Sequence, residues 1–145
     1  MIFEALLLGM ILGLICHETT GWNAGGIIAP GYIAFFLLEP LIILNIVCAL
    51  SVTYLIIWIM SRKMFLFGRR LLFASMILGF IIHYFIQTLL QTDSIVTTNI
   101  LLLGALIPGE INYEFHRQGI KKTVVALTAT TLIIKLGVIV ITSMF

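Results

Sequence analysis

The sequence predicts an all-α integral membrane protein. Of its 145 residues, 61% are hydrophobic and only 10% are charged, whereas a soluble domain carries about 25% charged residues. Apolar runs long enough to cross a bilayer as helices, which takes about 20 residues, follow one another along the chain. Most of the basic residues gather in two short segments between these runs. The composition therefore argues against a water-soluble globule.

Three of the apolar runs predict membrane spans directly. The runs 41–60 and 71–90 contain no Asp, Glu, Lys or Arg, and the run 123–142 contains only Lys135. The run 2–15 is shorter and holds Glu4. It lacks the basic residues that open a cleaved signal peptide, so we expect it to be retained as a fourth span.

Two further apolar segments each carry a Pro-Gly pair, Pro30-Gly31 and Pro108-Gly109. Proline removes a backbone donor and clashes with the preceding turn, and glycine lets the chain bend, so we expect both segments to be broken. A half-helix that begins at such a break would offer free backbone amides to a carboxylate. The alternative is a kink that improves the packing between helices.

The placement of charge predicts the topology. Seven of the eight basic residues lie in the two loops 62–70 and 117–122, and basic loops mark the cytoplasmic side of polytopic proteins more often than they mark a nucleic-acid site. An even number of crossings must then separate the two loops, so both Pro-Gly segments cross and both termini lie outside. The expected segments are 2–17, 25–39, 41–60, 71–91, 97–115 and 123–143. Four helices with two re-entrant loops are the alternative.

The Pro-Gly segments also align with each other at a spacing of 78 residues. Gly26 aligns with Gly104, and the first Pro-Gly pair aligns with the second. Each half of the chain, about 1–66 and 67–145, then contains a span, a broken span and a span. Because three is odd, the second half would be inverted relative to the first, as in many transporters. We expect one transmembrane domain, 1–145, built from two inverted repeats.

Two charged residues at membrane depth are candidates for a functional site. Lys135 lies near the middle of the last run, where an ionisable residue is costly and usually faces the bundle interior with a partner. Glu110, directly after the second Pro-Gly pair, is the expected partner, in a simple ion pair or in a substrate site. The sequence contains no phosphate loop, nucleophile elbow, zinc-type histidine spacing or dinucleotide fingerprint. We therefore expect neither catalysis nor a metal or other cofactor in this chain alone.

The segment ETTGWNAGGIIAPGY, residues 18–32, resembles the small integral membrane subunit of the poly-γ-glutamate synthase and capsule complex, the PgsC/CapC family. The GRR of residues 68–70, the IPG of residues 107–109 and the RQG of residues 117–119 match further family motifs in the same order. Glu110 and Lys135 are not part of that pattern. The residues that match the first motif are Glu18, Thr20, Gly21, Gly26, Pro30, Gly31 and Tyr32.

The resemblance implies a multi-pass protein of the bacterial cytoplasmic membrane that works with a Mur-ligase-like, ATP-dependent amide ligase. A capsule protein with an extracellular domain, and in some systems a very small membrane subunit, complete an assembly that makes poly-γ-glutamate and moves it outward. The subunit would be non-catalytic, and it would anchor the ligase, conduct the polymer, or do both. A small secondary transporter for an anionic solute is the alternative function, and assembly as a homo-oligomer stays open.

The candidate site residues fall into two groups. One group would bind the partner ligase, because exposed basic side chains attract anionic surfaces, although the same side chains could serve only as topology anchors. The other group would line the polymer path. The partner-binding candidates are Arg69, Arg70 and Arg117, and the path candidates are Glu18, Gly21, Gly26, Pro30, Gly31, Pro108, Gly109, Glu110 and Lys135.

Overall fold

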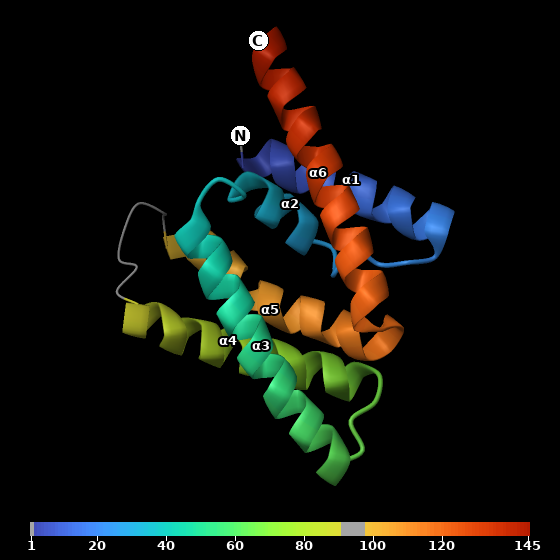
Figure 1. The fold of residues 1–145 in the computed structure, drawn as a ribbon, viewed down its shortest axis with the longest axis vertical. Helices are drawn as coiled ribbons and strands as arrows, with labels where there is room; N and C mark the ends of the chain where they lie inside the picture. Colours follow the sequence, from blue (N-terminus) through green and yellow to red (C-terminus); the bar gives the residue numbers. More distant parts are fainter. Residues whose placement is uncertain (1, 91–97) are drawn as a thin grey trace. The chain divides into compact units, whose positions relative to one another are not determined.

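The computed structural model describes residues 2–90 and 98–145, and the regular secondary structure within them is entirely α-helical (Figure 1). This confirms the all-α part of the predicted fold class, whereas the two inverted repeats stay a prediction. The ends of the expected segments 71–91 and 97–115 fall partly outside the described residues. The helices are α1 (Ile2–Thr20), α2 (Ala29–Phe35), α3 (Pro40–Lys63), α4 (Arg69–Leu90), α5 (Thr98–Gln118) and α6 (Ile120–Met144).

Four of these helices, α1, α3, α4 and α6, are long and apolar enough to cross a membrane. They coincide with the four apolar runs of the sequence, because a helix satisfies its backbone polar groups internally and so is the stable form of an apolar chain in lipid. Helix α2 has only 7 residues. Helix α5 has 21 residues, but Glu110, Asn112 and Glu114 make it more polar. Four of the six predicted crossings thus correspond to candidate spans, and within the described residues the two Pro-Gly segments do not.

The chain divides into two compact units. Unit 1 comprises Met1–Glu39 and Glu114–Phe145, so it holds α1, α2, the last turn of α5 and α6. Unit 2 comprises Pro40–Tyr113, so it holds α3, α4 and most of α5. Helices α1, α2 and α6 pack on one another in unit 1, and α3 packs on α4 in unit 2. Each unit thus contains the third helix of the other sequence half.

In unit 1, α1 and α2 meet at a contact between their backbones. A Cβ atom added to Gly31 would lie 2.6 Å from the Ala5 carbonyl oxygen and 2.9 Å from the Leu6 Cα. A Cβ added to Gly9 would lie 2.7 Å from the Gly31 Cα. Only glycine allows two backbones to approach this closely. The first Pro-Gly pair is therefore part of a tight helix crossing.

Unit 2 contains the same kind of contact between α4 and α5. A Cβ added to Gly109 would lie 2.5 Å from the Ser75 carbonyl oxygen and 2.6 Å from the Met76 Cα. A Cβ added to Gly79 would lie 2.6 Å from the Gly109 backbone nitrogen. The second Pro-Gly pair, like the first, lies where two backbones touch.

The expected break at the second Pro-Gly pair is not seen, because α5 continues through Pro108 from Thr98 to Gln118. A proline inside a helix removes one hydrogen bond and kinks the helix, but packing on both sides can hold the two parts together. Here Ile107 and Ile111 are 0% and 1% exposed, and Gly109 presses on α4. The expectation of two half-helices at this position is corrected accordingly.

At the first Pro-Gly pair the helix is interrupted before the proline and not at it. Pro30 is the second residue of α2, a first-turn position whose N–H would have no intrahelical partner. The preceding residues 21–28 are non-helical. Within them Gly21, Gly25 and Gly26 have φ values of 72°, 79° and 119°, a region that favours glycine.

Candidate functional site

The end of α1 is built by the motif residues that the sequence singles out. Gly21 follows the last helical residue with a positive φ, and its N–H donates to the His17 carbonyl oxygen at 2.8 Å, as in a glycine C-cap. The Trp22 N–H donates to the Thr20 hydroxyl at 3.2 Å. These bonds end α1 and direct the chain into the non-helical residues 21–28.

A hydrogen-bonded cluster in unit 1 then holds this stretch against the corner between α5 and α6. The Asn23 N–H donates to Gln118 Oε1 at 2.9 Å, and Gln118 Nε2 donates to the Asn23 carbonyl oxygen at 2.6 Å. Gln118 Nε2 also donates to Thr123 Oγ1 at 2.9 Å. The Asn23 side-chain amide donates to Glu114 Oε1 at 3.0 Å. We call Asn23, Glu114, Gln118 and Thr123 the amide clamp.

The amide clamp carries a buried charge with a partner. The Glu114 side chain is 7% exposed, and its Oε2 lies 3.3 Å from Nε of Arg117, whose side chain is 46% exposed. A buried carboxylate needs such pairing, because it has lost its hydration. Lys122 Nζ lies 5.9 Å from the centre of the Trp22 ring, within cation–π range. The basic corner between α5 and α6, which holds Arg117 and Lys122, therefore lies beside the loop that follows α1.

The non-helical stretch runs along most of α1. Asn23 follows the carboxyl end of α1, whereas Gly31 contacts Ala5 and Leu6 near its first turn. At 1.5 Å per helical residue these two levels are about 20 Å apart. Residues 25–28 form bends, with φ values of 79° at Gly25, 119° at Gly26 and −96° at Ile28, so the stretch is non-helical but not extended. The chain between α1 and α2 thus returns from the end of α1 toward its first turns without regular helical structure.

The structure separates the predicted path residues into three settings. Glu18 and Gly21 are exposed at the end of α1, and Gly26 is half-buried in the non-helical stretch. Both Pro-Gly pairs are buried at helix crossings. Glu110 and Lys135 are half-buried, but they belong to different units, so their pairing stays a prediction.

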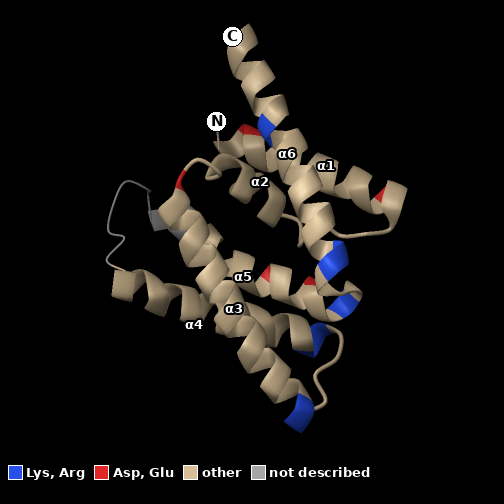
Figure 2. Ribbon diagram, in the orientation of Figure 1, with Lys and Arg blue, Asp and Glu red and all other residues tan. Residues whose placement is uncertain are grey.

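The predicted partner-binding residues also differ from one another. Arg69 and Arg70 are exposed at the start of α4, whereas Arg117 is engaged with Glu114. Figure 2 shows basic residues at the connection between α3 and α4 and at the corner between α5 and α6. The clamp residues Asn23 and Gln118 were not predicted. The one signal that could have found Gln118 was its place in the RQG motif.

Unit 2 buries two polar atoms that find no hydrogen-bond partner among the described residues, Asn45 Oδ1 on α3 and His83 Nδ1 on α4. Both side chains are at least nine-tenths buried, with 5% and 4% exposed. Leaving such atoms unsatisfied costs about 1–3 kcal/mol each, and native structures contain few of them. Unit 2 therefore holds buried polar atoms on both α3 and α4.

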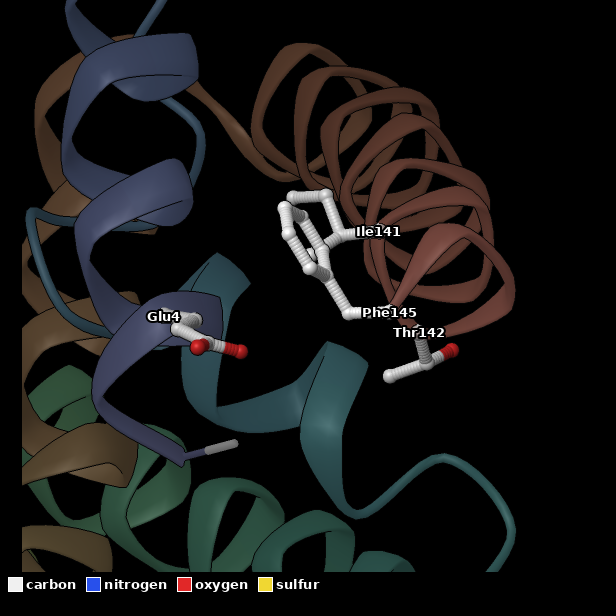
Figure 3. Close-up of a pocket in the computed structure, with 4 residues that line it drawn as sticks. All are labelled: Glu4, Ile141, Thr142 and Phe145. Atoms are coloured by element: carbon white, nitrogen blue, oxygen red, sulfur yellow. The ribbon is translucent and has the colours of Figure 1, made fainter.

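Two other features do not form a candidate site. A hollow between the first turn of α1 and the last turn of α6 is lined by Glu4, Ile141, Thr142 and Phe145 (Figure 3), but it lacks the converging polar groups of a ligand pocket. In the described part of the chain, no three His, Cys, Asp or Glu residues are placed to hold a metal ion.

Comparison with known proteins identifies the family. The sequence matches the family described as "Capsule biosynthesis CapC" over residues 8–124, which include both Pro-Gly pairs and the amide clamp. The chain belongs to the CapC family. This confirms the resemblance found in the motifs of residues 18–32.

Two relatives within the CapC family align along most of the chain. The "PGA biosynthesis protein CapC" of Bacillus subtilis (strain 168) is 30% identical over 123 residues, which are 84% of this chain and 83% of the relative. The "Capsule biosynthesis protein CapC" of Bacillus anthracis is 31% identical over 124 residues, 85% of this chain and 83% of the relative. No solved structure matches the chain.

Proposed function

We propose that this chain is the non-catalytic membrane subunit of a poly-γ-glutamate synthase complex. It anchors the ATP-dependent amide ligase and forms part of the export path for capsule or secreted polymer. The observation that carries this proposal is the CapC family match, which spans both Pro-Gly crossings and the clamp. The four helices able to cross a membrane support a location in the bacterial cytoplasmic membrane.

An internal repeat in the helix contacts supports the proposed two-repeat architecture. Gly9 and Gly79 are 70 residues apart in sequence, and each packs against the glycine of a Pro-Gly pair. Gly31 and Gly109, 78 residues apart, each press on the backbone of the preceding long helix. The α1–α2 crossing thus has the same design as the α4–α5 crossing.

The third helices repeat as well, at a spacing of 77 residues. Thr53 Oγ1 donates to the Ala49 carbonyl oxygen at 2.6 Å. Thr130 Oγ1 donates to the Ala126 carbonyl oxygen at 2.7 Å. All four residues are buried, and such agreement in identity, burial and hydrogen bonding supports three equivalent segments per half. The matching buried triplets are Ala49, Thr53 and Ile57 in α3, and Ala126, Thr130 and Ile134 in α6.

Three segments per half give the proposed six crossings, with both basic loops cytoplasmic and both termini outside. The contact between Trp22 and Lys122 puts the loop after α1 beside the second basic loop, as this topology requires. In this proposal the non-helical residues 21–28 together with α2 make the second crossing. If the first Pro-Gly segment were re-entrant instead, the chain after it would leave the membrane on the same side as Asn23.

For the export path, we propose that the polymer follows the non-helical stretch before Pro30. Glu18 and Gly21 lie at its cytoplasmic end, and backbone amides near Gly26 would meet the polymer's carboxylates weakly enough to let them move on. The first Pro-Gly pair and Lys135 are proposed path residues within unit 1, and Pro108, Gly109 and Glu110 are proposed path residues within unit 2.

For assembly, we propose that the amide ligase docks on the cytoplasmic side through Arg69 and Arg70. Arg117 is the third proposed docking residue, and it also pairs with the Glu114 carboxylate of the amide clamp. Exposed cations raise the association rate with an acidic surface and make it salt-dependent. A capsule protein with an extracellular domain, a very small membrane subunit and further copies of this chain are the other proposed partners.

The test is reconstitution of polymer synthesis in a bacterium that makes no polymer, by expressing the amide ligase and the capsule protein with or without this chain. With the chain present, we expect the ligase in the membrane fraction and polymer in the medium. Without it, we expect soluble ligase and no secreted polymer. Uptake of a small anionic solute by vesicles that hold this chain alone would instead favour the secondary transporter.

A further inference from the structure

The short connection between α3 and α4 exposes large apolar side chains. Met64 is 58% exposed, Phe65 is 87% exposed and Phe67 is 75% exposed. Side chains this apolar are costly to hold in water, since each fully buried one is worth about 1.5–3 kcal/mol. Three of them within four residues form a patch that calls for a partner surface.

The same connection is strongly basic. Arg62 and Lys63 precede it, Arg69 and Arg70 follow it, and no acidic residue occurs anywhere in residues 40–92. Within residues 2–90 and 98–145, no ion pair or hydrogen bond occupies the side chains of Lys63, Arg69 or Arg70. The second basic corner differs, because Arg117 there is paired with Glu114. The charge at the α3–α4 connection is thus uncompensated.

The geometry of the connection keeps its apolar side chains near the ends of the two helices. The Leu66 N–H donates to the Met64 carbonyl oxygen at 2.9 Å, and the Leu72 N–H donates to the Gly68 carbonyl oxygen at 3.2 Å. Gly68 has a φ of 59°, which turns the chain into α4. Both flanking helices are candidate spans that pack on each other, so a five-residue connection cannot leave the level of the lipid headgroups.

An exposed aromatic residue, Trp58, lies six residues before the connection on α3. Trp58 is 41% exposed, and the Arg62 guanidinium carbon lies 3.8 Å from the centre of its ring. Tryptophan is enriched at the membrane interface, and a stacked arginine can extend from it toward the headgroups while its stem covers apolar surface. The segment from Trp58 to Phe67 therefore has the composition of an interfacial anchor.

We propose that Trp58, Arg62, Lys63, Phe65 and Phe67 form a binding surface for anionic phospholipid. The two phenylalanine rings insert among the upper acyl chains, and Arg62 and Lys63 contact the phosphate-bearing headgroups. Charge complementarity and the direct continuity with two membrane spans favour lipid over a protein partner as the occupant. The surface goes beyond the proposed function, because it leaves Arg69 and Arg70 available to the ligase.

The insertion of the rings is tested on the full chain with one tryptophan, in the variant Trp22→Phe, Trp58→Phe, Phe65→Trp. The protein is reconstituted in vesicles of phosphatidylcholine alone or mixed with phosphatidylglycerol. We expect its fluorescence to be quenched by lipids brominated high in the acyl chain and shielded from acrylamide in the water. Strong acrylamide quenching with no bromolipid quenching in either vesicle would overturn the proposal.

The role of the charges is tested by the lipid that stays with the purified protein. A basic residue near an anionic surface contributes about 1 kcal/mol, so Arg62→Gln and Lys63→Gln should each lower the retained ratio of phosphatidylglycerol to phosphatidylcholine roughly fivefold. The matched control removes two cations at the other basic corner, Lys121→Gln with Lys122→Gln, and should change this ratio much less.

A protein occupant would give a different pattern. If Arg62→Gln and Lys63→Gln left the retained lipid unchanged, and the tryptophan introduced at position 65 were shielded from acrylamide only after the ligase was added, the surface would belong to the ligase interface. That outcome would overturn lipid binding while leaving the proposed function intact. Retention of the ligase by the Phe65→Ser, Phe67→Ser variant, together with reduced anionic lipid, would support the proposal.

Discussion

The two Pro-Gly segments make the same contact with the preceding helix, yet their backbones differ. Gly31 and Gly109 both touch a neighbouring backbone at distances that exclude a side chain. The chain before Pro30 is non-helical and α2, which contains Pro30, has 7 residues, whereas the helix around Pro108 is continuous over 21 residues. The Pro-Gly pair therefore determines the close crossing and does not by itself determine where the helix stops.

The residues before each pair account for the difference. Gly25 aligns with Leu103 at the 78-residue spacing, so only the first segment has two adjacent glycines before its proline. Both take positive φ values, and glycine in a helix interior costs about 1 kcal/mol relative to alanine. The amide clamp then supplies the hydrogen bonds that Asn23 loses by leaving the helix. Unwinding thus needs weak helix formers and a replacement for the lost bonds.

The largest expected effect comes from filling the crossings themselves. Gly31→Ala and Gly109→Ala each put a Cβ within about 2.6 Å of a backbone oxygen, so the helices must move apart, at a cost of about 1–3 kcal/mol or more. Chemical unfolding in detergent and accumulation in the membrane measure this cost. Gly13→Ala is the control, since no atom lies within 4 Å of its added Cβ. Equal behaviour of all three variants would mean that the two crossings are not tight.

The next largest effect should appear in the first Pro-Gly segment and not in the second. Gln118→Ala removes both partners of the Asn23 backbone, and a buried unsatisfied group costs about 1–3 kcal/mol. We expect faster hydrogen exchange and easier proteolysis in residues 21–28, with exchange in the Pro108 region of α5 unchanged. Thr128→Ala, which removes an exposed hydroxyl bonded within its own helix, serves as the comparison. Slow exchange in residues 21–28 of the Gln118 variant would show that the clamp is dispensable.

A smaller effect tests the glycine explanation for the unwinding. Gly25→Ala forces an alanine into a left-handed φ of 79°, which costs about 1–2 kcal/mol. Leu103→Ala at the aligned position should not strain the α5 backbone, although it loses some apolar contact. The free energy of unfolding of Gly25→Ala should therefore be compared with those of Leu103→Ala and Leu103→Val, since the two Leu103 variants show how much comes from lost apolar contact alone. An unstrained Gly25→Ala variant, as stable as the wild-type chain, would refute the role given to this glycine.

The smallest effect concerns the prolines. Pro108→Ala restores a donor inside a continuous helix and should raise stability by roughly 1 kcal/mol. Pro30→Ala acts in a first turn, where the restored N–H has no intrahelical partner, and should change stability by only a few tenths of a kcal/mol. Thermal unfolding of the two variants side by side decides this. A larger gain from Pro30→Ala would mean that the proline, and not the preceding glycines, interrupts the first segment.

The spans could be predicted from sequence because lipid imposes one simple rule on them. A charge-free run such as 41–60 has no stable alternative to a helix in a bilayer, and the structure has α3 there. The consequences of the prolines could not be predicted in the same way. Whether Pro108 ends a helix depends on how firmly Ile107 and Ile111 are packed, and that packing involves residues distant in sequence.

The amide clamp was beyond sequence reasoning for a similar reason. Asn23 and Gln118 are 95 residues apart, and neither belongs to a pattern with a known chemistry. The glycines opposite the Pro-Gly pairs, Gly9 and Gly79, lie within apolar runs where nothing distinguishes them from lipid-facing residues. The predicted pairing of Glu110 with Lys135 rested on estimated depth alone and stays a prediction.

The division of the chain into units has a consequence for its synthesis. Unit 1 needs α6, the last helix to be made, to complete the packing around α1 and α2. A ribosome adds about 5–20 residues per second, so the first segments wait on the order of ten seconds for their final neighbour. During this time Asn23, in the non-helical stretch before Pro30, has no Gln118 to bond to. The insertion machinery must therefore shelter an unfinished amino-terminal third, and a chain truncated before α6 should be recognised and degraded.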